Sequence, residues 1–532
     1  MQKPATAILF LLCFALLACS PADPDPDEGK GQQEPGQEYG VVADREGYSV
    51  KGYVSCDGEP LAGVVVSDGI HVTRTNLRGE YWLKSDERSD FVFVSAPSGT
   101  QVKTDGWKPG FYHRLTKSVT VARFDFELDK IDNDRHMMLA FADVHVSGRQ
   151  PLLTTKPSWT RLPYDSLQVR EHFIPDINDF AAGQSCPVYG ISLGDMMQDM
   201  HIEKASLPQY MQTIRDLAFP TYHVVGNHDH LPDLPVISED DQDAREFKEL
   251  YMSNLGPRYY SFNAGRVHYV VLDVIQLVGG GTNKYRTRLS DAQMKWLKQD
   301  LELIQDRSSM NLVIAAHVGT HRFGNTANRP ENGTVISNRD EIVSLCSGFN
   351  HVYVLSGHAH VSEVFKVNDN WTNIVHPSVC GSSWWSRTCT DGTKAAYTVY
   401  EFDGLSLRRT LKPYESGADE QMYIYADGQK SPDGNPAIII NVPAYELSKD
   451  RSGWTVTVKE EGTTASAERY DGKDPEFIET AALFYNADSS NQPKVTSHLF
   501  HYVPKNPDAM LTVTVSDSWG RSYSKTTTLT YE

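Results

Sequence analysis

Five apolar segments in the middle of this chain each run directly into a residue that can bind a metal ion. The segments are HMMLAFA before Asp143 and His145, VYGISLG before Asp195, TYHVVG before Asn227 and His228, NLVIAA before His317, and HVYVLSG before His358 and His360. Short apolar strands that alternate with helical stretches are typical of an α/β domain. Ligands of open α/β sheets gather outside the carboxyl ends of the strands, so we expect these side chains to share one crevice.

The residue types at these strand ends indicate which ions they bind. Aspartate, asparagine and histidine combine hard oxygens with imidazoles, a set that suits Zn, Fe or Mn better than Ca or Mg. There are more candidates than one tetrahedral ion needs, which predicts two divalent ions that share a carboxylate. The formal net charge of −19 argues against nucleic-acid binding, and a phosphate site in so acidic a chain needs a local positive source.

The order of these blocks resembles the calcineurin-like metallophosphoesterases, whose pattern is D-x-H, GD, GNH[D/E], a later His and GHxH. The chain carries Asp143-Val144-His145, Gly194-Asp195, Gly226-Asn227-His228-Asp229, His317 and Gly357-His358-Ala359-His360 in that order. One short block alone has a high false-positive rate, whereas the ordered set, with each block after a predicted strand, is specific.

The resemblance implies hydrolysis of a phosphomonoester or phosphodiester by a hydroxide held between two metal ions. Asp143, His145 and His360 would bind the first ion, Asn227, His317 and His358 would bind the second, and Asp195 would bridge them. Two ions about 3.5–4 Å apart clamp the phosphoryl oxygens, and metal binding lowers the pKa of water from 15.7 to about 7. His228 would stay off the metals and protonate the leaving group as a general acid.

Neighbouring residues narrow this interpretation. His228 needs a partner that orients its ring, and both Asp199 and Asp229 are candidates. Gln198 stands three positions after Asp195, where purple acid phosphatases carry a tyrosinate ligand, so a charge-transfer ferric site is not expected. Asp273 ends another apolar run, YVVLD, but the family pattern has no place for it.

Trp384, Trp385 and Arg387 follow the last motif in a loop rich in Gly and Ser, and they are candidate substrate-binding residues. The aromatic rings would line the substrate, and the guanidinium would bind phosphate through two hydrogen bonds. The alternative is that the tryptophans pack at the joint to the C-terminal region, because buried packing is the commoner role of Trp. Cys380 and Cys389 are candidates for a disulfide, which spacing alone does not establish.

The middle domain is expected to span residues 132–404, with helices at 290–304 and 339–347. Residues 41–131 contain short alternating runs, and VSCDGEPLAGVVVSDG with NLRGEYWL resembles a transthyretin-like sandwich. Residues 405–532 return to alternating strands. Together with the resemblance, this predicts a four-layer α/β sandwich, two mixed sheets flanked by helices, between two small all-β sandwich domains.

The first 40 residues are typical of an export signal followed by a spacer. Residues 7–18 are apolar but too few to span a bilayer, which takes about 20 residues. Leu16-Leu17-Ala18-Cys19 resembles the lipobox of bacterial lipoproteins, so residues 1–19 are predicted to be a signal that leaves a lipidated Cys19. Residues 20–40 are acidic and rich in Pro and Gly, as in an extended linker. We therefore expect a membrane-anchored lipoprotein of a Gram-negative-type bacterium, facing the periplasm or on the cell surface.

The alternative function is that of a non-catalytic, surface-binding lipoprotein whose phosphoesterase domain is a relic. Relics usually lose one or more motif residues, and none of the motif residues is missing here. The complete set favours the hydrolase.

Overall fold

The protein is described here by a computed structural model. It describes residues 40–85, 88–115, 121–146, 165–198, 206–230, 248–278, 284–323, 334–448, 453–484 and 492–529. The predicted signal peptide, residues 20–39 of the predicted linker, and Asp199 lie outside the described residues. Within the described part of the chain, no helix is both long and apolar enough to cross a membrane.

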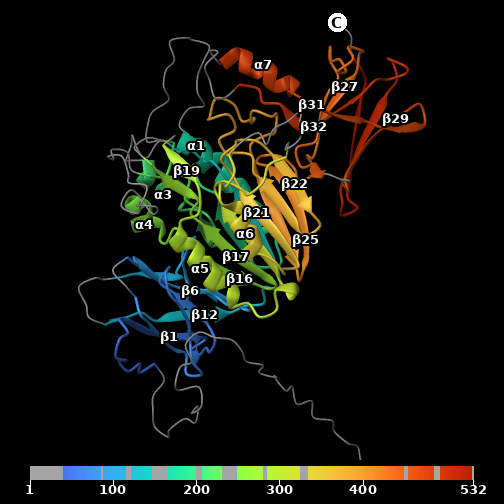
Figure 1. Cartoon of the computed structure of the whole chain (residues 1–532). Helices are drawn as coiled ribbons and strands as arrows, with labels where there is room; N and C mark the ends of the chain where they lie inside the picture. Colours follow the sequence, from blue (N-terminus) through green and yellow to red (C-terminus); the bar gives the residue numbers. More distant parts are fainter. Residues whose placement is uncertain are drawn as a thin grey trace, which may run out of the picture.

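The N-terminal region forms two larger sheets and one two-stranded sheet, drawn in blue in Figure 1. The first contains β1 (Val50–Cys56), β2 (Glu59–Pro60), β5 (Glu80–Leu83), β7 (Thr100–Val102), β11 (Ala122–Arg123) and β12 (Phe126–Lys130). The second contains β3 (Val65–Ser67), β4 (Val72–Arg74), β6 (Phe91–Ser95) and β10 (Tyr112–Arg114), and β8 (Thr104–Asp105) pairs with β9 (Lys108–Pro109). In β12 the buried Phe126 and Leu128 alternate with exposed or half-buried residues, as the period of two predicts.

Two larger sheets form the middle of the molecule. One has the order β15-β14-β13-β24-β25, made of β15 (Thr221–His223), β14 (Val188–Ser192), β13 (Arg135–Phe141), β24 (Ala396–Asp403) and β25 (Ser406–Pro413). The other has the order β16-β17-β20-β21-β23-β22-β28, made of β16 (Tyr260–Ala264), β17 (Val267–Leu272), β20 (Asn311–Ala316), β21 (His351–Ser356), β23 (Trp371–Val375), β22 (Glu363–Asn368) and β28 (Glu446–Ser448). Both sheets mix parallel and antiparallel pairs, as predicted.

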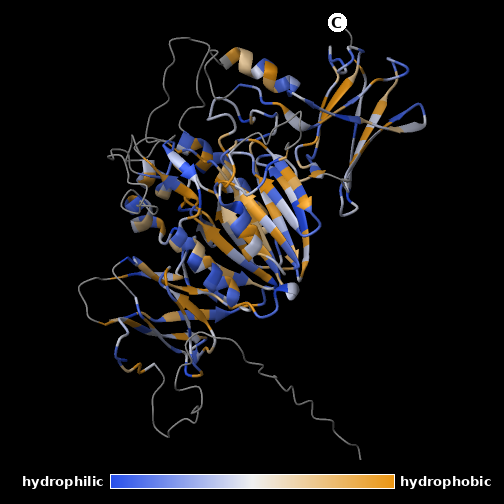
Figure 2. Ribbon diagram, in the orientation of Figure 1, coloured by the Kyte–Doolittle hydropathy of each residue, from blue (hydrophilic) through white to orange (hydrophobic). Residues whose placement is uncertain are grey.

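The two sheets pack face to face with helices outside them, which gives the predicted four layers. In β13 the side chains of Met138 and Ala140 join the core shared with the second sheet, whereas Met137, Leu139 and Phe141 join the core beneath the helices. Figure 2 shows many of the central strands in orange, in agreement with strands buried on both faces.

The helices follow the periodicity of the sequence. They are α1 (Asp165–Gln168), a π-helix (Val169–Phe173), α2 (Ile174–Ala182), α3 (Ser206–Ile214), α4 (Glu249–Leu255), α5 (Asp291–Glu302), a 3₁₀ turn (Arg307–Ser309) and α6 (Arg339–Leu345); β18 (Ile275–Leu277) and β19 (Tyr285–Thr287) form a small hairpin. The predicted helix at 290–304 is α5, and the Ser290 hydroxyl caps it by accepting a hydrogen bond from Gln293 N at 3.3 Å. The predicted helix at 339–347 is α6.

The C-terminal region has two four-stranded sheets and lies at the upper right of Figure 1. Its strands are β26 (Tyr423–Tyr425), β27 (Ile438–Asn441), β31 (Glu468–Gly472) and β32 (Thr496–Tyr502) in one sheet, and β29 (Thr455–Glu460), β30 (Thr463–Ser466), β33 (Leu511–Ser516) and β34 (Ser522–Thr527) in the other. The region is not all-β, because α7 (Pro475–Phe484) follows β31. Asp474 caps this helix by accepting a hydrogen bond from Phe477 N at 2.9 Å. The sequence Asp474-Pro475-Glu476 is a helix-start signal, but the alternating strands around it favoured an all-β prediction.

Two strands from beyond residue 404 belong to the central sheets. The expected boundary falls in the turn of the β24–β25 hairpin, so β25 completes the five-stranded sheet. Strand β28 pairs in parallel with β22 at the edge of the seven-stranded sheet. The division of the chain at residues 404 and 405 stays a prediction, but the two regions on either side of it share both sheets.

A buried polar network also joins the middle and C-terminal regions. His498 in β32 lies with its Nε2 3.1 Å from the Asp391 carboxylate and its Nδ1 2.7 Å from Asn441 Oδ1. Asp391 also accepts a hydrogen bond from Ser362 N at 2.7 Å, in the loop just after His360. The network therefore ties the C-terminal sheet to the last predicted metal-binding loop.

Candidate metal centre

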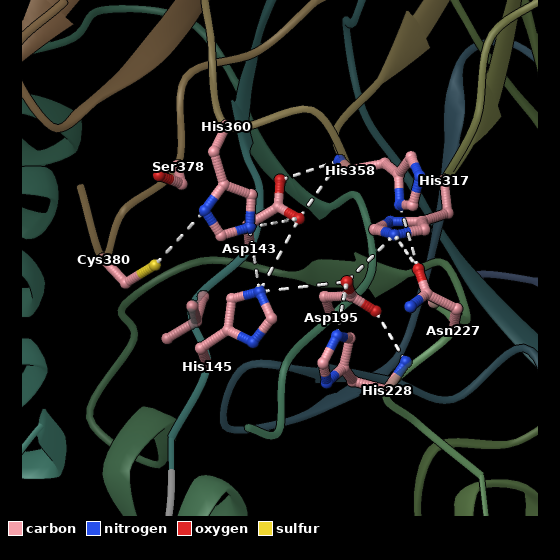
Figure 3. A network of polar contacts seen from close by, with 12 residues as sticks. Asp143, His145, Asp195, Asn227, His228, His317, His358, His360, Ser378 and Cys380 are labelled. Carbon is pink, nitrogen blue, oxygen red and sulfur yellow. Dashed lines mark hydrogen bonds and ion pairs between the residues drawn. The ribbon is translucent and has the colours of Figure 1, made fainter. Parts of the chain in front are cut away.

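The structure brings all seven predicted metal-binding side chains together at the carboxyl ends of the central strands, as Figure 3 shows. Asp143 and His145 follow β13, Asp195 follows β14, Asn227 follows β15, His317 follows β20, and His358 and His360 follow β21. Among the described residues, three groups of potential ligands have atoms within 4.8 Å of one another, and Asp195 belongs to two of them.

One side of the cluster contains Asp143, His145 and His360. The Nε2 atoms of His145 and His360 are 3.0 Å apart, and Asp143 Oδ1 is 3.4 Å from His360 Nε2 and 3.9 Å from His145 Nε2. The Asp143 carboxylate is fully buried and also accepts hydrogen bonds from His358 N at 2.9 and 3.1 Å.

The other side contains Asn227, His317 and His358. Asn227 Oδ1 lies 3.0 Å from His317 Nε2 and 2.9 Å from His358 Nδ1. Asp195 stands between the two sides, because its Oδ2 is 3.1 Å from His317 Nε2 and 3.8 Å from His145 Nε2.

The backbone of these loops is held in an unusual conformation. Asp143, His145, Asp195, His358 and His360 all have positive φ, between 50° and 71°. A residue other than glycine in this region costs of order 1–3 kcal/mol and persists only where its surroundings enforce it, as is common at functional sites.

The glycines of the motifs allow the loops to approach each other closely. A Cβ on Gly226 would lie 2.2 Å from both N and Oδ1 of Asp195, and a Cβ on Gly357 would lie 2.5 Å from Asp143 Oδ2. The side chain of any other residue would therefore displace a carboxylate of the cluster.

Burial and neighbouring charges shift the pKa values of the cluster in opposite directions. Burial lowers the pKa of His358 to about 3. Burial acts the same way on His317, but the Asp195 carboxylate outweighs it and raises the pKa of His317 to about 9. The pKa of His360 rises to about 10 because Asp143 likewise outweighs burial. Burial disfavours the charged form of Asp195, yet the His317 imidazole holds the pKa of that carboxyl well below its usual range.

His228 lies at the margin of the cluster, with about 21% of its side chain exposed. Its Nε2 is 3.9 Å from Asp195 Oδ2, and its Nδ1 contacts the backbone carbonyl of Gln198. Asp229 does not orient the ring. Its buried carboxylate accepts hydrogen bonds from Met196 N at 3.0 Å and Gly226 N at 2.8 Å, and thereby joins two of the metal-binding loops.

The structure corrects the interpretation of Trp384 as a wall of the substrate site. Its side chain is fully buried, and its Nε1 donates to the carbonyl oxygens of Val144 at 3.1 Å and His145 at 3.2 Å. The ring therefore offers no surface to a substrate and instead supports the loop that carries Asp143 and His145. Trp385 is half-buried, and its contact with a substrate stays a prediction.

Arg387 is also occupied by protein groups. Its Nη2 donates to Gln168 Oε1 at 2.6 Å, and its Nη1 pairs with the Glu415 carboxylate. Binding of phosphate by this guanidinium would require these contacts to break, so the structure does not favour the predicted role.

Cys380 is a neighbour of the cluster that the motif pattern missed. Its Sγ lies 4.0 Å from His360 Nδ1, and it forms a group of potential ligands with His145 and His360. The thiol follows β23, so the rule that strand ends supply ligands contained a signal for it. Cys380 and Cys389 are both free thiols, so the disulfide considered from the sequence does not form in this structure.

Asp273 has a structural role. Its buried carboxylate lies 2.6 Å from Lys248 Nζ and 2.5 Å from Arg258 Nη1. Two cations therefore neutralise this strand-end carboxylate, and it belongs to none of the three groups of potential ligands found among the described residues.

Three family models match the chain in sequence order. "N terminal of Calcineurin-like phosphoesterase" matches residues 48–131, "Calcineurin-like phosphoesterase" matches residues 138–362, and "C terminal of Calcineurin-like phosphoesterase" matches residues 374–523. The chain belongs to the calcineurin-like phosphoesterase family. It is a metallophosphoesterase, a hydrolase that uses divalent metal ions to cleave phosphate esters.

Comparison with solved structures finds distant likenesses. A dimetal phosphatase from Danio rerio is 13% identical, with a TM-score of 0.36, and the match covers 52% of this chain and 96% of that one. A 5'-nucleotidase from Candida albicans is 13% identical, with a TM-score of 0.32 and 52% of each chain covered. A purple acid phosphatase from yellow lupin, Lupinus luteus, is 13% identical, with a TM-score of 0.36, covering 66% of this chain and 67% of that one. Comparison with curated proteins finds no match, and the assignment rests on the family models.

Proposed function

We propose that the protein hydrolyses a phosphomonoester or phosphodiester with two divalent metal ions, Mn, Fe or Zn, and with His228 as the proton donor to the leaving group. The observation that carries the proposal is the position of Asp195 between two sets of ligand atoms. Asp143, His145 and His360 would hold one ion, Asn227, His317 and His358 would hold the other, and Asp195 would contact both.

The spacing of the donor atoms supports this assignment. Ligand nitrogens about 2.0–2.1 Å from one ion lie roughly 2.9–3.4 Å apart at tetrahedral or octahedral angles. The His145 and His360 Nε2 atoms are 3.0 Å apart, and Asn227 Oδ1 is 2.9–3.0 Å from the two imidazoles beside it. His145 Nδ1 is buried with no hydrogen-bond partner among the described residues. Nε2, which faces His360 and Asp195, is therefore the ring nitrogen that would bind the ion.

When bound, two such ions stabilise charge on the phosphoryl oxygens and lower the pKa of a water molecule that attacks phosphorus. The contribution of His228 is to hold a proton at Nε2 for the departing oxygen. Its Nδ1 proton is donated to the Gln198 carbonyl, and this contact stabilises the protonated ring and fixes its direction. In this proposal the backbone carbonyl of Gln198 orients the ring, whereas Asp229 does not. The role predicted for Asp199 stays a prediction, because Asp199 lies outside the described residues.

The first experiment tests the need for metal. Exhaustive chelation should abolish hydrolysis of a chromogenic phosphomonoester and a matched diester, and added Mn²⁺ or Zn²⁺ should restore it. Activity that persists in protein shown by elemental analysis to be metal-free would refute the proposal. Inactivity of the fully metal-loaded protein on both esters would favour the binding role instead.

The second experiment separates proton donation from metal binding. His228→Ala should lose 10²–10⁴-fold in kcat, the usual contribution of a general acid, while both ions remain bound. The control is His71→Ala, which changes a side chain 41% exposed in the N-terminal region and should leave the rate unaltered. Loss of metal stoichiometry in His228→Ala would show that this residue is a ligand.

We also propose that the protein is exported and anchored to a membrane through a lipid on Cys19. The apolar run followed by Leu16-Leu17-Ala18-Cys19 supports this proposal. Cells expressing the full chain and fed a labelled fatty acid should label the wild type but not Cys19→Ala, and the variant should appear in the soluble fraction. Equal labelling of both proteins would refute the anchor.

A further inference from the structure

A cavity of about 410 Å³ lies beside the metal cluster, between the middle and C-terminal regions. His358 and Ala359 line one side of it. The other side is lined by Lys494, two residues before β32, and by Thr496 and Ser497 at the start of that strand. This volume falls in the range of small-molecule sites. Because His358 belongs to both the cluster and the cavity, a substrate held at the metals can extend into this space.

The charge in the cavity differs from that of the whole chain, which is strongly acidic. Of its two carboxylates, Glu363 is paired with Arg322 at 2.8 Å, and Asp391 is buried in the network with His498. Lys494 is exposed, and its Nζ donates to the carbonyl oxygen of Ala359 at 2.8 Å. Within the described residues, no carboxylate forms an ion pair with this ammonium.

The remaining lining combines polar and apolar side chains, with Leu447 among the apolar ones. Ser362, Thr496 and Ser497 carry hydroxyl groups, Val361 and Val495 supply small apolar surfaces, and no Phe, Tyr or Trp is among the described residues that line the cavity. A nucleobase would find no aromatic side chain on which to stack. The Ser362 hydroxyl donates its proton to Pro443 O at 2.7 Å, so toward a ligand this oxygen can only accept. A framework with hydroxyl donors and a negative charge of its own matches this acceptor and the ammonium.

We propose that this cavity binds a remote part of the substrate's organic group, and that this part is a polyhydroxylated framework carrying an anionic group that pairs with Lys494. The inference rests on the proposed phosphoesterase function and narrows its substrate class. The ammonium lies at the loop between two candidate metal ligands, so it acts on the same substrate without contacting the ions. The C-terminal region thereby supplies a specificity-determining residue to the active site.

The test uses two six-carbon polyols that differ by one carboxylate. Gluconate and sorbitol are compared as inhibitors of chromogenic phosphoester hydrolysis by the metal-loaded full-length protein, and binding of each is measured by calorimetry. Gluconate should bind at least ten-fold more tightly than sorbitol. Lys494→Met should weaken gluconate binding at least ten-fold, about 1.4 kcal/mol, with little change in sorbitol binding. Lys494→Arg should retain most of the wild-type affinity for gluconate.

Lys459→Met is the matched control, because Lys459 is an exposed lysine on β29 of the same region. The inference is overturned if gluconate and sorbitol bind equally, or if Lys494→Met changes gluconate binding no more than the control does. Undiminished gluconate binding in Lys494→Met would place the carboxylate on the metals instead. If the wild type hydrolyses no phosphoester, the proposed function fails, while the calorimetric comparison still decides whether the cavity binds the anion.

Discussion

Replacement of Trp384 by phenylalanine tests whether a buried indole holds the metal-binding loop in place. The indole N–H is shared between the carbonyls of Val144 and His145. The same loop carries two residues with positive φ, Asp143 and His145. The substitution keeps an apolar ring but removes the donor, so the loop loses a restraint and two buried carbonyls lose a partner.

The expected magnitude follows from these contacts. Positive φ at Asp143 and His145 stores about 2–6 kcal/mol in total, at 1–3 kcal/mol each, which favours relaxation of the loop once the restraint is gone. The unsatisfied carbonyls cost about 1–3 kcal/mol more. Loss of a group that supports metal ligands typically weakens metal binding 10–100-fold. We expect Trp384→Phe to fall at the lower end of this range. The substitution should weaken binding of the ion assigned to Asp143, His145 and His360 about ten-fold, or 1.4 kcal/mol.

Trp371→Phe provides the control for the loss of ring volume. Trp371 is a buried tryptophan in β23, but its Nε1 has no hydrogen-bond partner among the described residues. Competition with a chelator of known affinity should give a metal dissociation constant within about two-fold of wild type for Trp371→Phe, since no hydrogen bond is lost.

Equal weakening by the two substitutions would refute the hydrogen-bond argument and leave ring volume as the cause. A rise in KM for an ester with an aromatic leaving group, with metal affinity unaltered, would instead show that Trp384 contacts the substrate.

Three further outcomes are expected. Because the pKa of His317 is raised to about 9 and that of His360 to about 10, both are protonated at pH 7 in the metal-free protein. Their raised pKa values stabilise the metal-free fold fully below pH 6.5 and progressively less as pH rises through 9 and 10. Metal binding should therefore release protons and tighten from pH 6 to 9, as calorimetry in buffers of different ionisation enthalpy would show; a pH-independent affinity would contradict this. Asp273→Asn should lower stability by about 3–5 kcal/mol, because it leaves two buried cations unneutralised, with metal content per folded molecule unaltered; loss of a metal ion would make Asp273 a ligand. His498→Ala should make the C-terminal region more susceptible to limited proteolysis by breaking the network at Asp391, and a wild-type cleavage pattern would refute that role.

The arrangement of the site was accessible from the sequence because each ligand ends an apolar strand. Neighbouring parallel strands of one sheet end at the same edge, so Asp143 and Asp195, after β13 and β14, could be brought together without coordinates. His317 follows β20 of the other sheet, and it joins them because the two sheets pack against each other. The same rule applies to Cys380, which follows β23, but the family pattern contains no cysteine after that strand, so the motifs did not predict it.

The errors arose where long-range packing decides the outcome. Trp384 and Arg387 stand in a loop whose composition suits substrate binding, and only the three-dimensional fold reveals that the first is buried and the second is paired with Glu415. The cavity between the middle and C-terminal regions could likewise not be predicted from the sequence. Lys494 and His358, which both line it, lie far apart in sequence and come together only because β32 packs beside the metal cluster.

The pairing of β28 with β22 has a consequence for anyone who shortens this protein. Deleting the chain after the β24–β25 hairpin would remove β28 and leave the N–H and C=O groups of β22 open along one side. An uncovered strand of this kind recruits strands from other molecules. The isolated middle region is therefore expected to aggregate in solution even when its hydrophobic core is intact. A stable fragment must retain β28, Glu446–Ser448.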